Sequence, residues 1–148
     1  NNAHVRIGES VIICGAGGIG LNIIQAAALV SAYPIIAIDL YDHKLQLAKS
    51  FGATHLINSG KQPIHAELLS ILNERQADVF IDNTGLPQLI ELGYEVTHGQ
   101  GRIILVGVPR KGAHINIYSL PLHFGKQITG SHGGEAVPHL DIPRYHQL

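Results

Sequence analysis

The feature that most constrains the fold of this chain is a short apolar run that leads directly into a glycine-rich bend. Residues 11–14 (VIIC) are all apolar, which is typical of a parallel strand buried on both faces. The next six residues, 15–20, read GAGGIG, and apolar residues then recur at helical spacing from 20 to 30. A strand, a tight turn and a helix in direct succession predict the first half of a βαβ unit.

The rest of the chain repeats this alternation of short apolar runs and longer helical segments. The further predicted strands cover residues 35–39, 55–57, 78–82, 103–106 and 126–130. Helices are predicted to begin near Asp42, Pro63 and Leu86. Repeated βαβ units form a parallel sheet with helices on both faces. We therefore expect an α/β Rossmann fold, a doubly wound parallel sheet of about six strands, in one domain over residues 1–148.

The composition agrees with a compact fold and excludes several classes of protein. Of the 148 residues, 45% are hydrophobic and 14% charged, which excludes a disordered chain. Ten Lys and Arg against eleven Asp and Glu leave no charge excess for binding nucleic acid or a membrane surface. No apolar run approaches the ~18 residues of a membrane span. The single cysteine, Cys14, cannot form an internal disulfide, which favours a reducing, cytoplasmic location.

The two ends of the sequence suggest a piece of a longer polypeptide. The chain contains no methionine, begins with Asn1, and shows no signal peptide. Near the other end, residues 141–143 (DIP) are a helix-start signature only a few positions before the last residue. We expect an excised domain.

The bend at 15–20 matches the pattern G-x-G-x-x-G, in which each glycine has its own physical use. Gly15 permits the turn out of the strand, Gly17 lets the backbone approach a pyrophosphate, and Gly20 allows the helix to pack on the strand. Free N–H groups at the helix start, around Gly18 and Ile19, would hold the diphosphate with the positive end of the helix dipole. A plain strand-to-helix turn is the alternative, since the bare pattern is weak.

An acidic residue at the end of the second strand supports a dinucleotide site. Asp39 would accept hydrogen bonds from the hydroxyls of the adenosine ribose. Its carboxylate would repel a 2′-phosphate, and the next residues, Leu40 and Tyr41, supply no arginine to receive one. NAD is therefore favoured over NADP. Lys44 would reach the same ribose, or is a solvated lysine on the helix.

With these features in place, the sequence resembles the cofactor-binding half of the medium-chain, zinc-type alcohol dehydrogenase family. Three further segments carry the resemblance: DNTG at 82–85, VGVP at 106–109 and GSHGG at 130–134. The resemblance implies an NAD(H)-binding domain of an enzyme that transfers a hydride between a small alcohol or aldehyde and nicotinamide. It also implies zinc in a catalytic domain that this chain lacks.

The resemblance implies roles for residues in these three segments, at the carboxyl ends of strands, where ligands of such sheets bind. The residues expected to line the path of the adenosine and the nicotinamide ribose are Asn83, Thr84, Gly85, Gly107, Val108 and Pro109. The residues whose backbone groups would hold the nicotinamide carboxamide are Val106, Val108, Gly130 and His132. Ordinary glycine-rich loops are the alternative for each segment.

A short strand with one exposed face is predicted around Ile115 and Ile117, where apolar and polar residues alternate. By the same resemblance it matches the edge through which the family forms dimers. An exposed edge strand is a template for pairing with another chain. We therefore expect a homodimer through this edge.

The sequence contains no catalytic residue and no metal site that we can name. No two of the ten histidines are three to five residues apart, as zinc motifs require. His132, His139 and His146 recur every seven residues, but Pro138 and Pro143 are expected to prevent a shared helix. Asp78 and Asp82 flank a buried strand and are expected to serve turns or caps. Cys14 is expected to be a small buried residue of the core.

Two other functions remain as alternatives. A non-catalytic nucleotide-sensing module would bind NAD or another adenine nucleotide with the same loop. A methyltransferase-like domain would use the loop for S-adenosylmethionine, but it would not account for the segments at 106–109 and 130–134.

Overall fold

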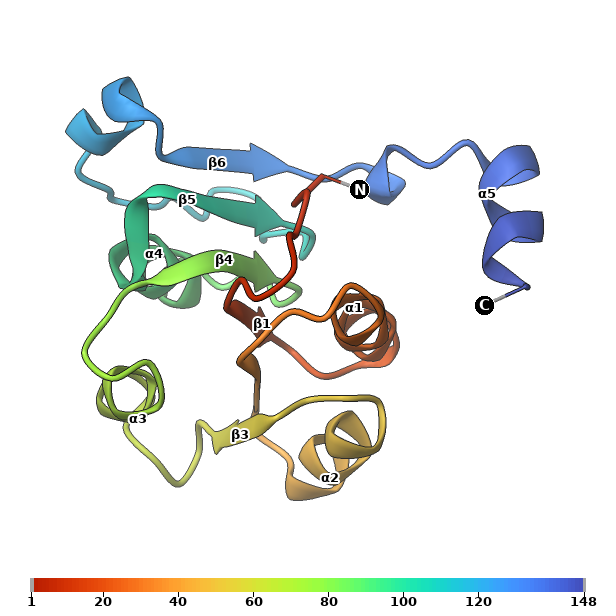
Figure 1. Ribbon diagram of the computed structural model, residues 1–148. Helices are drawn as coiled ribbons and strands as arrows, with labels where there is room; N and C mark the ends of the chain where they lie inside the picture. The colour runs from red at the N-terminus through yellow and green to blue at the C-terminus, as the bar shows by residue number, and fades with distance from the viewer. Residues whose placement is uncertain (1, 148) are drawn as a thin grey trace.

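The computed structural model describes residues 2–147, so both ends of the predicted domain, Asn1 and Leu148, lie outside it. One six-stranded sheet has the order β3-β2-β1-β4-β5-β6, and every pair of neighbouring strands is parallel (Figure 1). The strands are β1 (Val11–Cys14), β2 (Ile35–Asp39), β3 (His55–Asn58), β4 (Ala77–Asp82), β5 (Thr97–Leu105) and β6 (Gln127–Gly130). The predicted doubly wound sheet is confirmed, and the strand order reverses between β1 and β4.

Helices cover both faces of the sheet, as predicted. On one face lie α1 (Gly18–Leu29) and α2 (Asp42–Ser50), and on the other α3 (Ile64–Ile71) and α4 (Pro87–Val96) (Figure 1). Three further helical segments are η1 (Leu120–Phe124), η2 (Gly133–Glu135) and α5 (Pro138–Tyr145). Helix α5 stands away from the sheet (Figure 1). Within residues 2–147, no helix has the length and hydropathy needed to cross a bilayer.

The central strand β1 contributes to two separate hydrophobic cores because alternate residues of a strand face opposite sides. Val11 and Ile13 pack with Ile24 of α1 in the first core. Ile12 and Cys14 belong to the second core, on the side of α3 and α4. All four strand residues are buried, which explains why the run is apolar without interruption.

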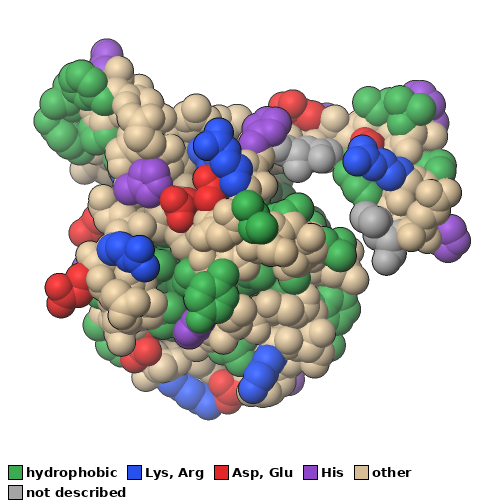
Figure 2. Space-filling view, viewed as in Figure 1, with side chains coloured by type: hydrophobic (Ala, Val, Ile, Leu, Met, Phe, Trp, Pro, Cys, Tyr) green, Lys and Arg blue, Asp and Glu red, His purple; other side chains and the backbone are tan. Residues whose placement is uncertain are grey.

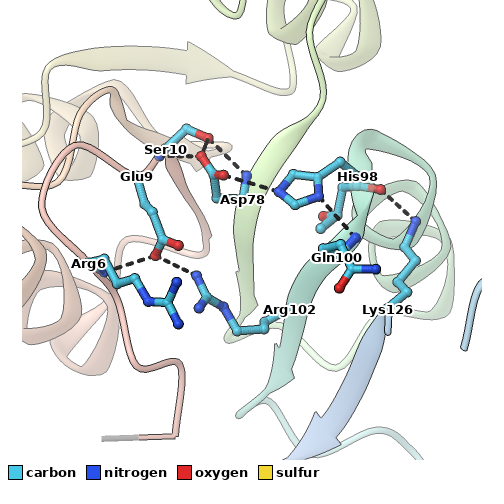
Figure 3. A network of polar contacts seen from close by, with 9 residues as sticks. Arg6, Glu9, Ser10, Asp78, His98, Gln100, Arg102 and Lys126 are labelled. Carbon is cyan, nitrogen blue, oxygen red and sulfur yellow. Dashed lines mark hydrogen bonds and ion pairs between the residues drawn. The ribbon is translucent and has the colours of Figure 1, made fainter. Parts of the chain in front are cut away.

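A polar network holds together the amino ends of the central strands (Figure 3). The Asp78 carboxylate accepts hydrogen bonds from the N–H of Ser10 (2.8 Å) and from its hydroxyl (2.7 Å), and His98 lies 3.1 Å away. The Glu9 carboxylate lies 2.5 Å from the Arg102 guanidinium. The network ties the segment before β1 to β4 and β5. Asp78 therefore joins strands, rather than serving the turn or cap expected of it.

The strand predicted around Ile115 and Ile117 is wrong. Residues 113–119 form no strand and pair with no neighbour in the described sheet. The Asn116 N–H donates instead to the Glu91 carboxylate (2.7 Å), and the Tyr118 carbonyl accepts from the Tyr94 hydroxyl (2.7 Å). Because side chains of α4 bind these backbone groups, the segment is held against the helix rather than in a ladder.

The prediction for the last helix is also wrong. Helix α5 begins at Pro138 rather than at 141–143, and it contains Pro143, which was expected to prevent a helix here. Pro138 stands in the first turn, where the missing N–H has no helical partner in any case. The Asp141 carboxylate accepts the Val137 N–H (2.8 Å) and so stabilises the helix start. His132 lies before η2, outside α5, so the three evenly spaced histidines share no helix.

The Asp78 contacts predict a pH dependence of folding. Burial raises the pKa of Asp78, but the hydrogen bonds from Ser10 and His98 outweigh it and hold the pKa below its ordinary value of 3.8. A carboxyl group with a lowered pKa stabilises the fold above its unfolded-state pKa, and this stabilisation is lost as pH falls through the folded-state pKa. We expect Asp78→Asn to lower the free energy of unfolding at pH 7 by about 1 kcal/mol, since the carboxylate is partly exposed. Denaturant titrations at pH 7 and pH 3 should show a smaller acid-induced loss in the variant; equal losses would contradict the assignment.

Candidate functional site

A cleft of about 380 Å³ opens at the carboxyl ends of β1, β2 and β4, beside the point between β1 and β4 where the strand order reverses. Nine of the predicted site residues line it: Gly15, Gly17, Gly18, Ile19, Gly20, Asp39, Lys44, Asn83 and Thr84. A wider groove of about 550 Å³ lies between α4 and residues 116–126, and none of the predicted site residues lines it. The cleft, rather than the larger groove, therefore gathers the groups that the sequence singled out.

The turn between β1 and α1 has the geometry expected of its first and last glycines. Gly15 has a φ of +93°, in the left-handed region that favours glycine. A Cβ atom on Gly20 would lie 2.0 Å from the Gly15 carbonyl oxygen, so a side chain at this position cannot fit. Helix α1 can therefore start directly against the end of β1.

Gly17 and Gly18, in the middle of the turn, differ from Gly15 and Gly20, because the packing of the protein does not require glycine at these two positions. A Cβ on Gly17 or Gly18 would meet no atom within 4 Å, and the φ of Gly17, −78°, suits any residue. Both glycines line the cleft, next to the first N–H groups of α1, which have no partner inside the helix. Open space beside unpaired N–H groups at a helix start is suited to a phosphate group.

Asp39 lies at the other end of the cleft and is fixed by backbone donors. Its carboxylate accepts the Ala16 N–H (2.9 Å) and the Tyr41 N–H (3.1 Å). The Lys44 ammonium lies 4.0 Å from the same carboxylate and 5.0 Å from the centre of the Tyr41 ring. The Asp39 side chain is 9% exposed and that of Lys44 38%, so a carboxylate and an ammonium face the cleft together.

The loops after β4 and β5 pack backbone against backbone. The Asn83 amide donates to the Gly15 carbonyl (3.3 Å) and so joins the first loop to the glycine turn. A Cβ on Gly85 would lie 2.6 Å from the Val108 carbonyl, and one on Gly107 would lie 2.3 Å from the Gly85 nitrogen. Glycine is needed at both positions because the two loops touch.

Six predicted site residues lie along the carboxyl edge of the sheet but not on the cleft walls. They are Gly85, Val106, Gly107, Val108, Gly130 and His132. Gly130 pairs with Leu105 at the end of β6 and is exposed, as is His132. The Val108 side chain is 89% exposed. The structure thus places these six residues in a row that continues from the cleft towards β6.

The predicted site residues do not include the mostly apolar remainder of the cleft wall. The further lining residues are Cys14, Ile38, Leu40, Tyr41, Ser59, Leu86 and Leu89. Leu40, Tyr41 and Leu86 are large, apolar and exposed, and each follows closely on the carboxyl end of a strand. Exposed apolar residues at these positions were the signal that could have identified them, because ligand pockets are mostly lined by apolar side chains.

Cys14 lies at the base of the cleft without the character of a reactive thiol. Burial, with the nearby charges of Asp82 and Asp39, raises the pKa of Cys14 to about 12. The thiolate is the reactive form, so this thiol is inert near neutral pH. Across residues 2–147, no three His, Cys, Asp or Glu side chains gather closely enough to hold a metal ion.

Comparison with known proteins gives consistent matches. A protein-family model described as zinc-binding dehydrogenase matches residues 18–148. The chain is 34% identical over 151 residues to the S-(hydroxymethyl)glutathione dehydrogenase of Paracoccus denitrificans, covering 97% of this chain and 40% of that protein. It is 35% identical over 122 residues to the galactitol 1-phosphate 5-dehydrogenase of Escherichia coli, covering 82% of this chain and 35% of that protein.

Solved structures agree with these sequence matches. The benzyl alcohol dehydrogenase of Acinetobacter calcoaceticus matches with a TM-score of 0.92 and 32% identity, covering 100% of this chain and 41% of that one. An alcohol dehydrogenase zinc-binding domain protein from Burkholderia ambifaria matches with a TM-score of 0.92 and 33% identity, covering 100% and 40%. The chain therefore spans about 40% of the length of the relatives that it matches.

Proposed function

Because the chain belongs to the zinc-binding dehydrogenase family, we propose that residues 1–148 are the NAD(H)-binding domain of an alcohol dehydrogenase-like oxidoreductase. The complete protein would transfer a hydride between a small alcohol or aldehyde and nicotinamide, with zinc held in a domain outside this chain. The named relatives are dehydrogenases, which favours this function over a nucleotide sensor or a methyltransferase-like domain. The observation that carries the proposal is the open space at Gly17 and Gly18, inside the cleft and beside the start of α1.

The residues of the cleft fit such a cofactor. The N–H groups at the start of α1 would bind its diphosphate, and Asp39 with Lys44 would bind the adenosine ribose. Leu40 and Leu86 offer apolar surface to a flat ring. The bound nicotinamide supplies the hydride donor or acceptor, and the row from Gly85 to His132 would orient it.

We further propose that NAD is preferred over NADP. The Asp39 carboxylate is nearly buried and held by two backbone N–H groups, so it cannot swing away from a 2′-phosphate. Lys44 is the cation nearest to that carboxylate, at 4.0 Å, and the negative charge of Asp39 offsets its attraction for a phosphate.

A cytoplasmic location completes the proposal. The chain has one cysteine, Cys14, which is free and buried. A chain that forms no internal disulfide suits the reducing conditions of that compartment.

We also propose a homodimer through the surface around Ile115 and Ile117, although this segment is not a strand in the single chain. Hydrophobic side chains gather over η1 at the upper left of Figure 2. Tyr118 is 70% exposed and Phe124 69%, which is typical of a surface that another chain covers.

Sedimentation analysis tests the dimer. We expect a dimer for the unmodified chain and a monomer for the double variant Tyr118→Lys and Phe124→Lys, because two buried charges oppose association. Leu29→Lys, at an exposed apolar position on α1, is the matched control and should remain dimeric. A monomeric unmodified chain would rule out this interface for the isolated domain.

Titration with NADH, followed by its fluorescence, tests the binding function itself. We expect binding by the unmodified chain and a loss of at least about 100-fold in affinity for Gly17→Val, since the valine would fill the space proposed for the diphosphate. Gly99→Val is the matched control, because its Cβ also meets nothing within 4 Å but lies outside the cleft. Normal binding by Gly17→Val would show that the diphosphate does not occupy this turn.

The preference for NAD is tested by substituting Asp39. We expect Asp39→Ala to weaken NADH binding by about 10- to 100-fold, because a hydrogen bond to a charged group contributes about 1.5–3 kcal/mol. The ratio of NADH to NADPH affinity should fall in both Asp39→Ala and Asp39→Asn. The asparagine variant keeps an acceptor for the Ala16 N–H and so separates the effect of charge from that of the loop. Unchanged affinities for both cofactors, measured by calorimetry, would disprove the ribose assignment.

A further inference from the structure

Asp82, the last residue of β4, is fully buried and binds the loop that follows it. One carboxylate oxygen accepts the Thr84 hydroxyl (2.6 Å) and the Thr84 N–H (3.1 Å), and the other accepts the Gly85 N–H (2.8 Å). Both oxygens are therefore occupied by donors of residues 84 and 85.

The backbone of the same residue binds the neighbouring loop. The Asp82 carbonyl accepts the N–H of Val106 (2.8 Å) and the N–H of Gly107 (2.9 Å), just beyond the end of β5. Five hydrogen bonds thus converge on one residue, three on its side chain and two on its carbonyl. They hold loops 83–85 and 106–109 at a fixed distance from each other.

The contact between these loops leaves little freedom for either. Gly85 has a φ of +69°, and a Cβ on it would clash with the backbone of Val108. A Cβ on Gly107 would likewise clash with the backbone nitrogen of Gly85. Because no side chains lie between the loops, a displacement of one loop also displaces the other. The group that anchors loop 83–85 therefore also determines the position of loop 106–109.

The chemistry of the anchor requires a carboxylate. Among the residues that the structure describes, no Lys, Arg or His nitrogen lies within 4.0 Å of the Asp82 carboxylate. Its charge is therefore balanced by hydrogen-bond donors rather than by an ion pair. An asparagine in the same place has one acceptor oxygen and would point an N–H donor at one of these donors.

We propose that Asp82 is a positioning residue for the cofactor, acting through loops 83–85 and 106–109 on the part of NAD(H) that lies beyond the cleft. This inference rests on the proposed function, because it assumes that NAD(H) occupies the cleft and extends along the carboxyl edge. On the adenosine side, two further features do not involve Asp82: Asp39 accepts the Ala16 N–H, and Gly20 lets α1 start against the Gly15 carbonyl. Loss of the anchor should therefore weaken binding of the whole dinucleotide more than binding of its adenosine half.

The test compares two substitutions on the same strand. Asp82→Asn removes the anchor at the carboxyl end of β4, and Asp78→Asn removes a carboxylate with similar backbone and hydroxyl contacts at the amino end (Figure 3). Dissociation constants for NADH and for AMP are measured by titration, well below each melting temperature. We expect Asp82→Asn to weaken NADH binding about tenfold or more and AMP binding less than about threefold. Asp78→Asn should change both by less than about twofold, although it lowers stability.

The outcomes separate this inference from the proposed function. If the unmodified chain binds neither NADH nor AMP, the proposed function fails. If it binds both and Asp82→Asn binds NADH equally well, or loses both ligands to the same extent, Asp82 has only a structural role and the inference is overturned.

A measurement on the unmodified chain covers the case in which Asp82→Asn does not fold. Hydrogen exchange should show the amides of Gly85, Val106 and Gly107 protected at least about 100-fold more than that of Gly112, a glycine in an exposed turn. Exchange of these three amides at the rate of Gly112 would show that Asp82 does not fix the loops, and would overturn the inference.

Discussion

The close approach of α1 to the end of β1 is the contact on which the rest of the site depends. No side chain fits between Gly20 and the Gly15 carbonyl, so the helix starts where the strand stops. This places the unpaired N–H groups of the first helical turn at the carboxyl edge of the sheet, between the loops of the neighbouring strands. A longer or wider turn would bury these donors or direct them to solvent, and the cleft would lose its source of positive potential.

Polar side chains from the two strands next to β1 hold the glycine turn in place. From β2, Asp39 accepts the Ala16 N–H, and from the loop after β4, Asn83 donates to the Gly15 carbonyl. Asp82 then fixes that loop in turn. A turn made flexible by its glycines is thereby restrained by polar side chains at the cleft walls, so the turn is ordered before a ligand arrives. Asp39 has a double task, since the carboxylate proposed to select the ribose also holds the turn.

The parts of the structure that follow from local sequence could be predicted, and those that depend on distant side chains could not. The apolar run 11–14 and the glycines after it specify a strand and a turn by themselves, because burial on both faces and a positive φ are local requirements. The alternation around Ile115 and Ile117 is equally strand-like, but Glu91 and Tyr94 of α4 bind the backbone groups that a ladder would need. The start of α5 depends on Pro138 and on the hydrogen bond from the Val137 N–H to the Asp141 carboxylate, and the DIP signature at 141–143 does not reveal this start. For Asp82, a role in a turn or cap was predicted, and it binds the turn at residues 84 and 85. Its contact with the loop after β5 depends on the pairing of β4 with β5 and could not be predicted.

The candidate site has two halves of different character. This difference explains how one half can provide affinity for the proposed cofactor while the other orients it. The half at β1 and β2 is a cleft with apolar walls, a fixed carboxylate and free N–H groups, so contacts there can provide most of the affinity. The half along β5 and β6 is an open row of backbone groups and glycines, with Val108 almost fully exposed. Such a surface contributes little by burial, and its value lies in the fixed position of its N–H and C=O groups. Fixed positions require rigid loops, which is why a fully buried carboxylate stands at the junction between the two halves.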